Sequence, residues 1–181
     1  MNPELVQFRQ AGQRKQVGVA AVEFSLVCLL FFTLLFSILE FGRMLFVFNT
    51  MQEVTRSAAR EATVSWIDQV AIVKQKSLFG GGAIPAGAEV AAANIRIEYL
   101  DKTGVVITAF PSDPGDNLSA CNDTTRVQSC IVSVRVSIVD TADSNQGVYY
   151  APMVTLFSFL RIRLPVSTVT IHAESLGFTD G

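Results

Sequence analysis

The sequence is poor in the residues that usually carry catalytic chemistry. Its 181 residues include one histidine, three cysteines and one tryptophan. His172 stands alone, and no nucleophilic residue has a base at a recognisable spacing. The glycine-rich stretch at 80–87 lacks the lysine and the hydroxyl residue that a phosphate-binding loop needs. We therefore expect no enzymatic activity, no metal and no cofactor.

A basic surface is missing as well. The formal net charge is −2, and residues 79–181 carry ten acidic against six basic side chains. Such a balance does not attract a phosphate backbone, so we expect no nucleic-acid partner. Asp113, Asp116 and Asp123 fall in one polar loop, which could hold calcium or simply be solvated; their spacing fits no EF-hand.

The sequence does contain one long apolar run near its N-terminus. The run from Val17 to Leu39 would span about 34 Å as a helix, which matches a bilayer core of about 30 Å. Basic residues at 9, 14 and 15 precede it and favour a cytoplasmic N-terminal end. We expect a single-pass anchor, with everything after residue 43 on the far side of the membrane.

A carboxylate lies near the head of this run. An unpaired carboxylate deep in a bilayer costs on the order of 2.5–3.5 kcal/mol, so Glu23 needs either an interfacial position or a partner. Cleavage after Gly18 would supply a partner, because the new α-amino group on Val19 lies about one helical turn from Glu23. The residues alone leave both explanations open.

The residues around this carboxylate resemble a known processing motif. Gly18 followed by VAAVEF resembles the prepilin peptidase motif, in which glycine precedes the cut and glutamate is the fifth mature residue. The stretch 18–61 is similar to TadE-like proteins, the minor pseudopilins of tight-adherence pilus systems. The EFGR at 40–43, the strand-like CIVSVRVSIV and the late VSTVTIHAES fit that family's layout more loosely. The 80–125 region fits no family pattern.

The resemblance implies a pilus subunit that does no chemistry itself. Prepilin peptidase would cut between Gly18 and Val19, while Glu23 and Phe24 would serve recognition and assembly. The implied partners are this peptidase, other pilin and pseudopilin subunits, an inner-membrane assembly platform and the lipid bilayer. The implied location is the bacterial inner membrane, with an extracytoplasmic C-terminal domain and later incorporation in a pilus. The apolar phenylalanines of the run would fill a pilin bundle or face lipid: Phe24, Phe31, Phe32 and Phe36.

The main alternative is an uncleaved single-pass sensor or binding domain. Such an anchor needs neither Gly18 nor Glu23, so the motif argues against it. A membrane-tethered hydrolase is a still weaker alternative, because no nucleophilic residue has a recognisable base.

The chain as a whole predicts a pilin-like α+β fold, with a long N-terminal helix followed by a small antiparallel sheet. We divide it into a leader (1–18), a transmembrane and stem helix (19–78) and an extracytoplasmic β-rich domain (79–181). Residues 40–78 contain no proline and only one glycine, Gly42, where we expect a bend. The glycines at 80–82 end the helix. Apolar residues recur along the stem at spacings close to three or four: Met44, Phe48, Met51, Ala58, Ala62 and Trp66.

Alternating apolar residues predict the strands. A hairpin is expected over 94–110, turning at 101–104, with further strands at 132–138 and 168–173. His172 falls on the outer face of the last strand. The apolar segment 151–160 is too short to span a membrane, so we expect it to pack onto the sheet or against the membrane surface.

Two of the cysteines flank a polar loop. Cys121 and Cys130 are nine residues apart, and a disulfide between them would suit an extracytoplasmic domain. Two free thiols remain the alternative. Cys28 lies within the apolar run, where it serves as a small packing residue.

Overall fold

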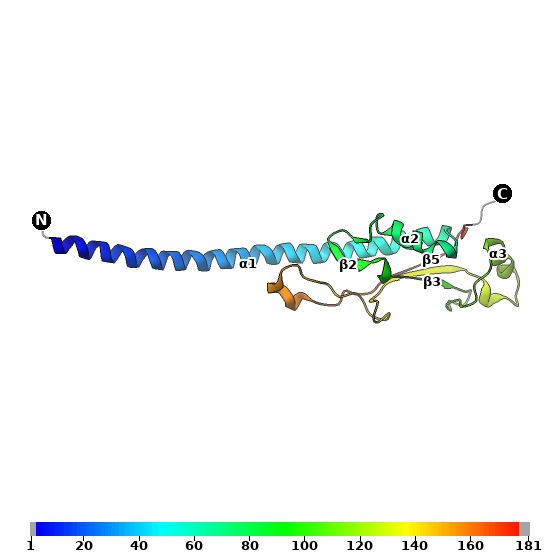
Figure 1. Cartoon of the computed structure of the whole chain (residues 1–181). Coiled ribbons are helices and arrows are strands. Elements are labelled where there is room, and N and C mark those ends of the chain that lie inside the picture. The colour runs from blue at the N-terminus through cyan, green and yellow to red at the C-terminus, as the bar shows by residue number, and fades with distance from the viewer. Residues whose placement is uncertain (1–2, 178–181) are drawn as a thin grey trace. The chain divides into compact units, whose positions relative to one another are not determined.

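The computed structural model describes the backbone of residues 3–177 and the side chains of residues 18–177. The chain forms two compact units, Met1–Gly42 and Arg43–Gly181. Helix α1 (Pro3–Val64) contributes to both (Figure 1). It begins inside the predicted leader and keeps helical backbone through Gly42, the residue where the sequence predicts a bend. Met1, Asn2 and the basic side chains at 9, 14 and 15 lie outside the described residues.

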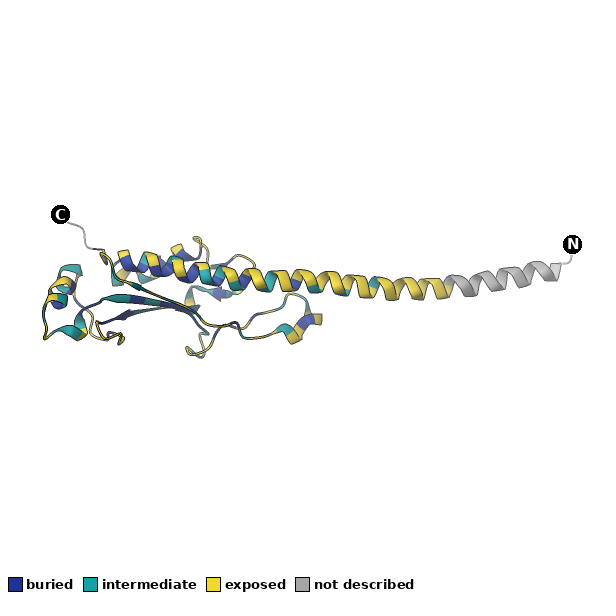
Figure 2. Cartoon of the chain, turned by 180° about the vertical axis from the view of Figure 1, so that it is seen from behind, coloured by how far each residue is buried: buried dark blue, intermediate teal, exposed yellow. Residues whose placement is uncertain are grey.

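The two parts of α1 differ in how their apolar residues are distributed. From residue 18 to residue 39 most side chains are exposed on every side of the helix (Figure 2). From Arg43 onward one face is buried, at spacings of three and four residues. The prediction is confirmed for Met51, Ala58 and Ala62, and Met44 and Trp66 pack against the same core. The buried face also includes residues that the prediction left out: Val47, Val54, Thr55 and Ala59.

The stem helix ends earlier than its sequence predicts. α1 stops at Val64, and a 3-10 turn η1 (Ile67–Gln69) and a short helix α2 (Val70–Ser77) follow. The carbonyl of Thr63 accepts hydrogen bonds from the backbone N–H groups of Glu174 (3.3 Å) and Leu176 (3.1 Å). Because helix-terminal carbonyls need partners, this distant segment stabilises the end of α1. Nothing local in the sequence signals that contact.

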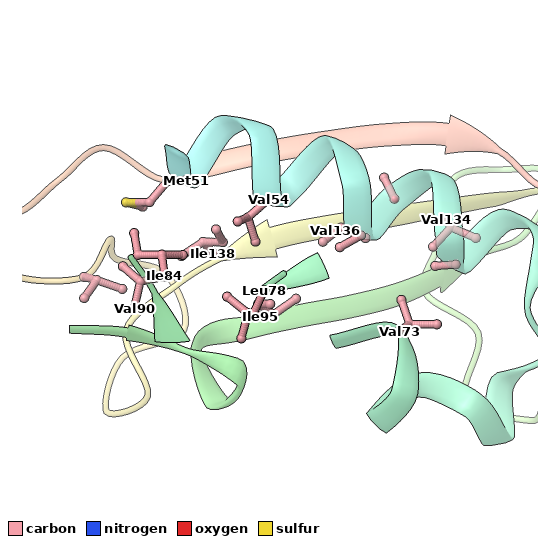
Figure 3. Close-up of a cluster of buried hydrophobic side chains, with 14 of the residues drawn as sticks. Met51, Val54, Val73, Leu78, Ile84, Val90, Ile95, Val134, Val136 and Ile138 are labelled. Atoms are coloured by element: carbon pink, nitrogen blue, oxygen red, sulfur yellow. The ribbon is translucent and has the colours of Figure 1, made fainter. Parts of the chain in front are cut away.

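A three-stranded antiparallel sheet packs on the second part of α1. Its order is β3 (Ile95–Leu100), β4 (Ser133–Ile138) and β5 (Ser167–His172). The strand predictions over 132–138 and 168–173 are confirmed. Val134, Val136 and Ile138 are fully buried on the central strand, and Figure 3 shows them with Val54 of α1. Burial of these side chains joins the helix to the sheet.

The hairpin predicted over 94–110 forms only near its turn. Its turn forms, since the Gly104 N–H donates to the Asp101 carbonyl (3.1 Å) and Gly104 has a φ of 82°. The 105–107 segment pairs with the end of β3 through the Val106–Leu100 bridge, and the Ile107 N–H donates to the Tyr99 carbonyl at 2.9 Å. Along its whole length β3 pairs with β4. The second side of the hairpin is short, and Ile107 is the one buried residue of the 105–110 segment.

Several shorter elements were not predicted from the sequence. A two-stranded sheet pairs β1 (Ala83–Ile84) with β2 (Gly87–Ala91). Gly87 suits its position because a Cβ there would lie 2.7 Å from Ile84 Cγ1 and 3.1 Å from Val47 Cγ2. The remaining elements are η2 (Ala92–Asn94), α3 (Pro114–Asn122), η3 (Val127–Ser129) and η4 (Thr155–Leu160).

Residues 148–164 form a narrow hairpin, which we call the arm. The Tyr150 N–H donates to the Ile162 carbonyl, and the Leu164 N–H donates to the Val148 carbonyl, both at 2.9 Å. Gly147 precedes the arm, and a Cβ there would lie 1.8 Å from the Leu164 carbonyl oxygen. η4 forms the tip. Packing onto the sheet was one of the two expectations for residues 151–160. Most of this segment does not pack in that way, since Phe157 is its only buried side chain.

Arg43 of α1 binds three distant segments of the folded unit that it begins. Its guanidinium donates to the carbonyls of Ala86 and Ala151, both at 2.8 Å, and to both carboxylate oxygens of Glu89 at 3.2 Å. The same group lies 4.9 Å from the centre of the Tyr150 ring. The side chains of Arg43 and Glu89 are only 14% and 9% exposed. A nearly buried pair leaves an uncompensated charge when one partner is removed.

We predict that Arg43→Gln lowers the free energy of unfolding by about 3 kcal/mol, because Glu89 is left charged and nearly buried. Urea unfolding of the full chain in detergent measures this loss. Arg126→Gln is the matched control, since Arg126 pairs with Asp116 at 2.8 Å but its side chain is 40% exposed. The control should cost about 1 kcal/mol or less. Equal losses in the two variants would contradict the role assigned to Arg43.

Candidate cleavage and assembly segment

Gly18 lies inside α1, where helix packing gives no reason for a glycine. An added Cβ at this position would meet nothing within 4 Å. A glycine in a helix interior costs about 1 kcal/mol relative to alanine. The described residues therefore offer no structural benefit that offsets this cost. This favours a requirement outside the fold, such as recognition by another protein.

Glu23 follows Val19 by four residues on the same helix. Residues at this spacing lie on one face, so the Glu23 carboxylate lies about one turn from the backbone nitrogen of Val19. Its own neighbours at the same spacing are apolar, including Ala20, Leu26 and Val27. No described side chain forms an ion pair with Glu23. The carboxylate is thus a single charge on an otherwise apolar surface.

The surface that surrounds Glu23 is apolar over some twenty residues. Phe24 is 70% exposed. Among the described helices, Gly18–Val64 is the one long and apolar enough to cross a membrane. The other large exposed side chains before Leu39 are Val19, Val22, Leu26, Val27, Leu29, Leu30, Phe31, Phe32, Leu34, Leu35, Phe36 and Ile38. Such a surface is stable in lipid or against other apolar helices, not in water.

The hydroxyl groups on this segment are already paired with its backbone. Ser25 donates to the Val22 carbonyl (2.8 Å), Thr33 to Leu29 (2.7 Å) and Ser37 to Thr33 (2.7 Å). Because an unpaired polar group is costly in hydrocarbon, these bonds adapt the segment to an apolar environment. Glu23 is left as the group that still needs a partner there.

Cys121 and Cys130 are joined by a disulfide, with their Cα atoms 4.7 Å apart. Cys121 lies near the end of α3, and Cys130 directly follows η3. Asn117 makes a second link at the same place, since its side-chain oxygen accepts from the Ile131 N–H at 2.8 Å. Together the two links fasten the 112–130 loop to the chain that enters β4. Cys28 is a free thiol within the apolar segment.

The carboxylates of this loop are engaged in local turns. Asp113 caps α3 by accepting from the Asp116 N–H at 2.8 Å. The Ser112 N–H, and next the Arg126 guanidinium, lower the pKa of Asp116. The Thr125 hydroxyl and N–H lower the pKa of Asp123. The described residues contain no group of acidic, histidine or cysteine side chains placed to hold a metal ion. His172 is exposed on β5, the outer face that its alternation predicts.

The segment that contains Gly18 and Glu23 matches a known protein family. Residues 18–60 match the family model described as TadE-like protein. The resemblance predicted from the sequence is confirmed over this stretch. The match covers 43 of the 181 residues, and TadE-like proteins are structural components of pilus systems. No curated protein and no solved structure matches the chain.

The structure adds one residue to those that the sequence analysis singled out. Arg43 lies within the EFGR stretch, and its position directly after the apolar run was the only local signal. Its partners lie 43, 46 and 108 residues further along the chain. The predicted site residues fall in two places: Gly18, Val19, Glu23 and Phe24 lie together on α1, whereas Cys121 and Cys130 lie in the 112–130 loop.

We predict that Cys121 and Cys130 are bonded in protein taken from the bacterial envelope, while Cys28 stays reduced. The bond should form because the fold holds the two thiols together and an extracytoplasmic compartment is oxidising. Peptide mapping by mass spectrometry under non-reducing conditions, after alkylation of free thiols, reports both states. Free thiols at 121 and 130 in a folded chain would argue against export of this domain.

Proposed function

We propose that this chain is a minor pilin or pseudopilin subunit of a tight-adherence pilus system. In this proposal prepilin peptidase cuts after Gly18, and α1 holds the subunit in the inner membrane until it joins other pilin subunits. The observation that carries the proposal is Gly18, which packing does not require, five residues before the single charge of the apolar segment. The family match over residues 18–60 supports the same assignment.

The geometry of α1 suggests how cutting and assembly are linked. The bond between Gly18 and Val19 is helical, so a peptidase has to unwind the helix locally, and glycine lowers the cost of doing so by about 1 kcal/mol. After the cut, the helix begins at Val19. Glu23 then lies about one turn from the new N-terminus. The protonated amine of Val19, or that of a neighbouring subunit, can pair with it in the apolar bundle.

We predict that co-expression with the cognate prepilin peptidase yields a chain that begins at Val19. N-terminal sequencing or intact mass measures the product. Gly18→Trp should block the cut, since the motif requires a small residue there, whereas Gly18→Ala should be partly tolerated. Both variants should fold, because the space around residue 18 is open. A mature chain with another start, or an uncut chain that still supports piliation, would favour the uncleaved sensor instead.

We predict that Glu23→Leu is inserted, cleaved and stable but fails to assemble. The substitution makes the span more apolar, so membrane retention should be unchanged, while the amine of Val19 loses its partner. Glu23→Asp should be intermediate, because the carboxylate is one methylene shorter. Co-purification with partner pilins and fibre counts by microscopy are the measurements.

Glu53→Leu provides a matched control for the loss of a carboxylate. Glu53 is exposed on the same helix but lies beyond the apolar segment, so this variant should assemble like the parent chain. Normal assembly of Glu23→Leu would show that Glu23 is only an interfacial residue, even with the family assignment intact.

A further inference from the structure

The base of the arm is fixed, whereas its tip is apolar and exposed. Val148, Tyr150 and Leu164 are buried in the core of the folded unit. At the tip, Leu156 is 60% exposed and Phe159 is 73% exposed. Phe159 contacts the buried Phe157 edge to face, with ring centres 6.2 Å apart. The tip is therefore a supported apolar projection.

The composition of the arm is unusual for this domain. Residues 151–160 contain no charged side chain, and their only hydroxyl groups are those of Thr155 and Ser158. The whole arm holds two arginines and no acid, although residues 79–181 carry ten acids against six bases. The arm thus combines an apolar tip with a local positive charge in an acidic domain.

The cations lie at the base of the apolar tip, around an aromatic ring. The guanidinium carbons of Arg163 and Arg161 lie 4.1 Å and 5.7 Å from the centre of the Tyr149 ring. Arg163 also pairs with Asp140 at 3.3 Å. Arg161 has no carboxylate partner among the described residues. Apolar groups next to a tyrosine and an arginine are typical of segments that lie in the headgroup region of a membrane.

The arm is held at the residue where the folded unit begins. Arg43 Nη1 donates to the Ala151 carbonyl at 2.8 Å, at the start of the apolar tip segment. Arg43 follows Leu39, the last residue of the predicted span, by four residues, about 6 Å along a helix. Leu45 and Phe46, which come next on α1, are exposed as well. Apolar side chains from two segments are therefore exposed in the unit that begins where the chain leaves the span.

From these observations we propose that the tip of the arm inserts into the outer surface of the membrane that α1 spans. Leu156 and Phe159 enter the acyl boundary, and Arg161 binds the phosphate headgroups of anionic phospholipids. The inference rests on the membrane span of the proposed function. It adds a second, reversible membrane contact, made by the folded domain, which a subunit has to release when it leaves the bilayer.

Quenching of tryptophan fluorescence by brominated lipids tests the proposal on the full chain. Trp66 is the only tryptophan, so Trp66→Phe provides a silent background for Phe159→Trp. The probe is the protein in vesicles of phosphatidylglycerol and phosphatidylcholine, at few copies per vesicle. We expect a blue-shifted emission and several-fold stronger quenching than for Leu118→Trp, another exposed apolar position, on α3. Equal quenching at the two positions would overturn the proposal.

A second probe keeps the test decisive if Trp66→Phe unfolds the chain. Phe159→Cys and Leu118→Cys in a Cys28→Ser chain then carry an environment-sensitive thiol dye, because the disulfide cysteines do not react. Arg161→Gln should remove the preference of the tip for phosphatidylglycerol over phosphatidylcholine. Arg60→Gln, a change at an exposed arginine of α1, should not.

Carbonate extraction separates failure of the arm from failure of the anchor. A chain that carbonate removes from the vesicles overturns both proposals. A chain that stays in the membrane with its tip unquenched overturns the arm alone. If the tip becomes buried only after partner pilins are added, it contacts protein and not lipid. This result would also overturn the lipid assignment.

Discussion

The apolar surface of α1 has to be buried by two different environments, and the rest of the structure follows from this constraint. Before residue 40 the apolar residues surround the helix, so lipid or neighbouring apolar helices have to cover every side. After Arg43 they occupy one face, which is covered by the chain's own sheet. A single helix thus combines a segment that is apolar enough to cross a membrane with the core element of the folded domain.

The folded domain depends on distant segments that attach to this helix at both ends of its second part. Arg43 binds the loop between β1 and β2, Glu89 and the start of the arm tip. At the other end, the carbonyl of Thr63 accepts hydrogen bonds from the segment after β5. Between them, Val47, Met51 and Val54 contribute to the core of the domain. Two polar anchors and one apolar face therefore set where the domain begins and ends on the helix.

Local periodicity explains which elements could be predicted from the sequence. β4 and β5 follow from strict alternation, and the buried face of α1 follows from spacings of three and four. The elements that could not be predicted depend on contacts far apart in sequence. The pairing of β3 with β4 joins strands that are more than thirty residues apart, and α1 ends where the C-terminal segment meets it.

The same distinction applies to the candidate site. Gly18 and Glu23 stand out in sequence because their spacing is local, and the structure adds that Gly18 has no packing role. The partner proposed for Glu23 is a chain end that exists only after a cut, or a neighbouring subunit. A single uncut chain contains neither. The cluster at the base of the arm needed the fold, because Tyr149 lies twelve and fourteen residues from Arg161 and Arg163 and no motif links them.

The central claim is that α1 passes from a membrane into a folded extracytoplasmic domain. The most direct test is to measure thiol accessibility in spheroplasts that lack the prepilin peptidase. In a Cys28→Ser chain, single substitutions Gln13→Cys, Phe31→Cys and Asn49→Cys report on the two sides and the middle of the span. We predict that a membrane-impermeant maleimide labels Asn49→Cys in intact spheroplasts and Gln13→Cys only after permeabilisation. Phe31→Cys should stay unlabelled in both. Labelling of positions 13 and 49 from the same side, or of position 31 by the water-soluble reagent, would contradict the account.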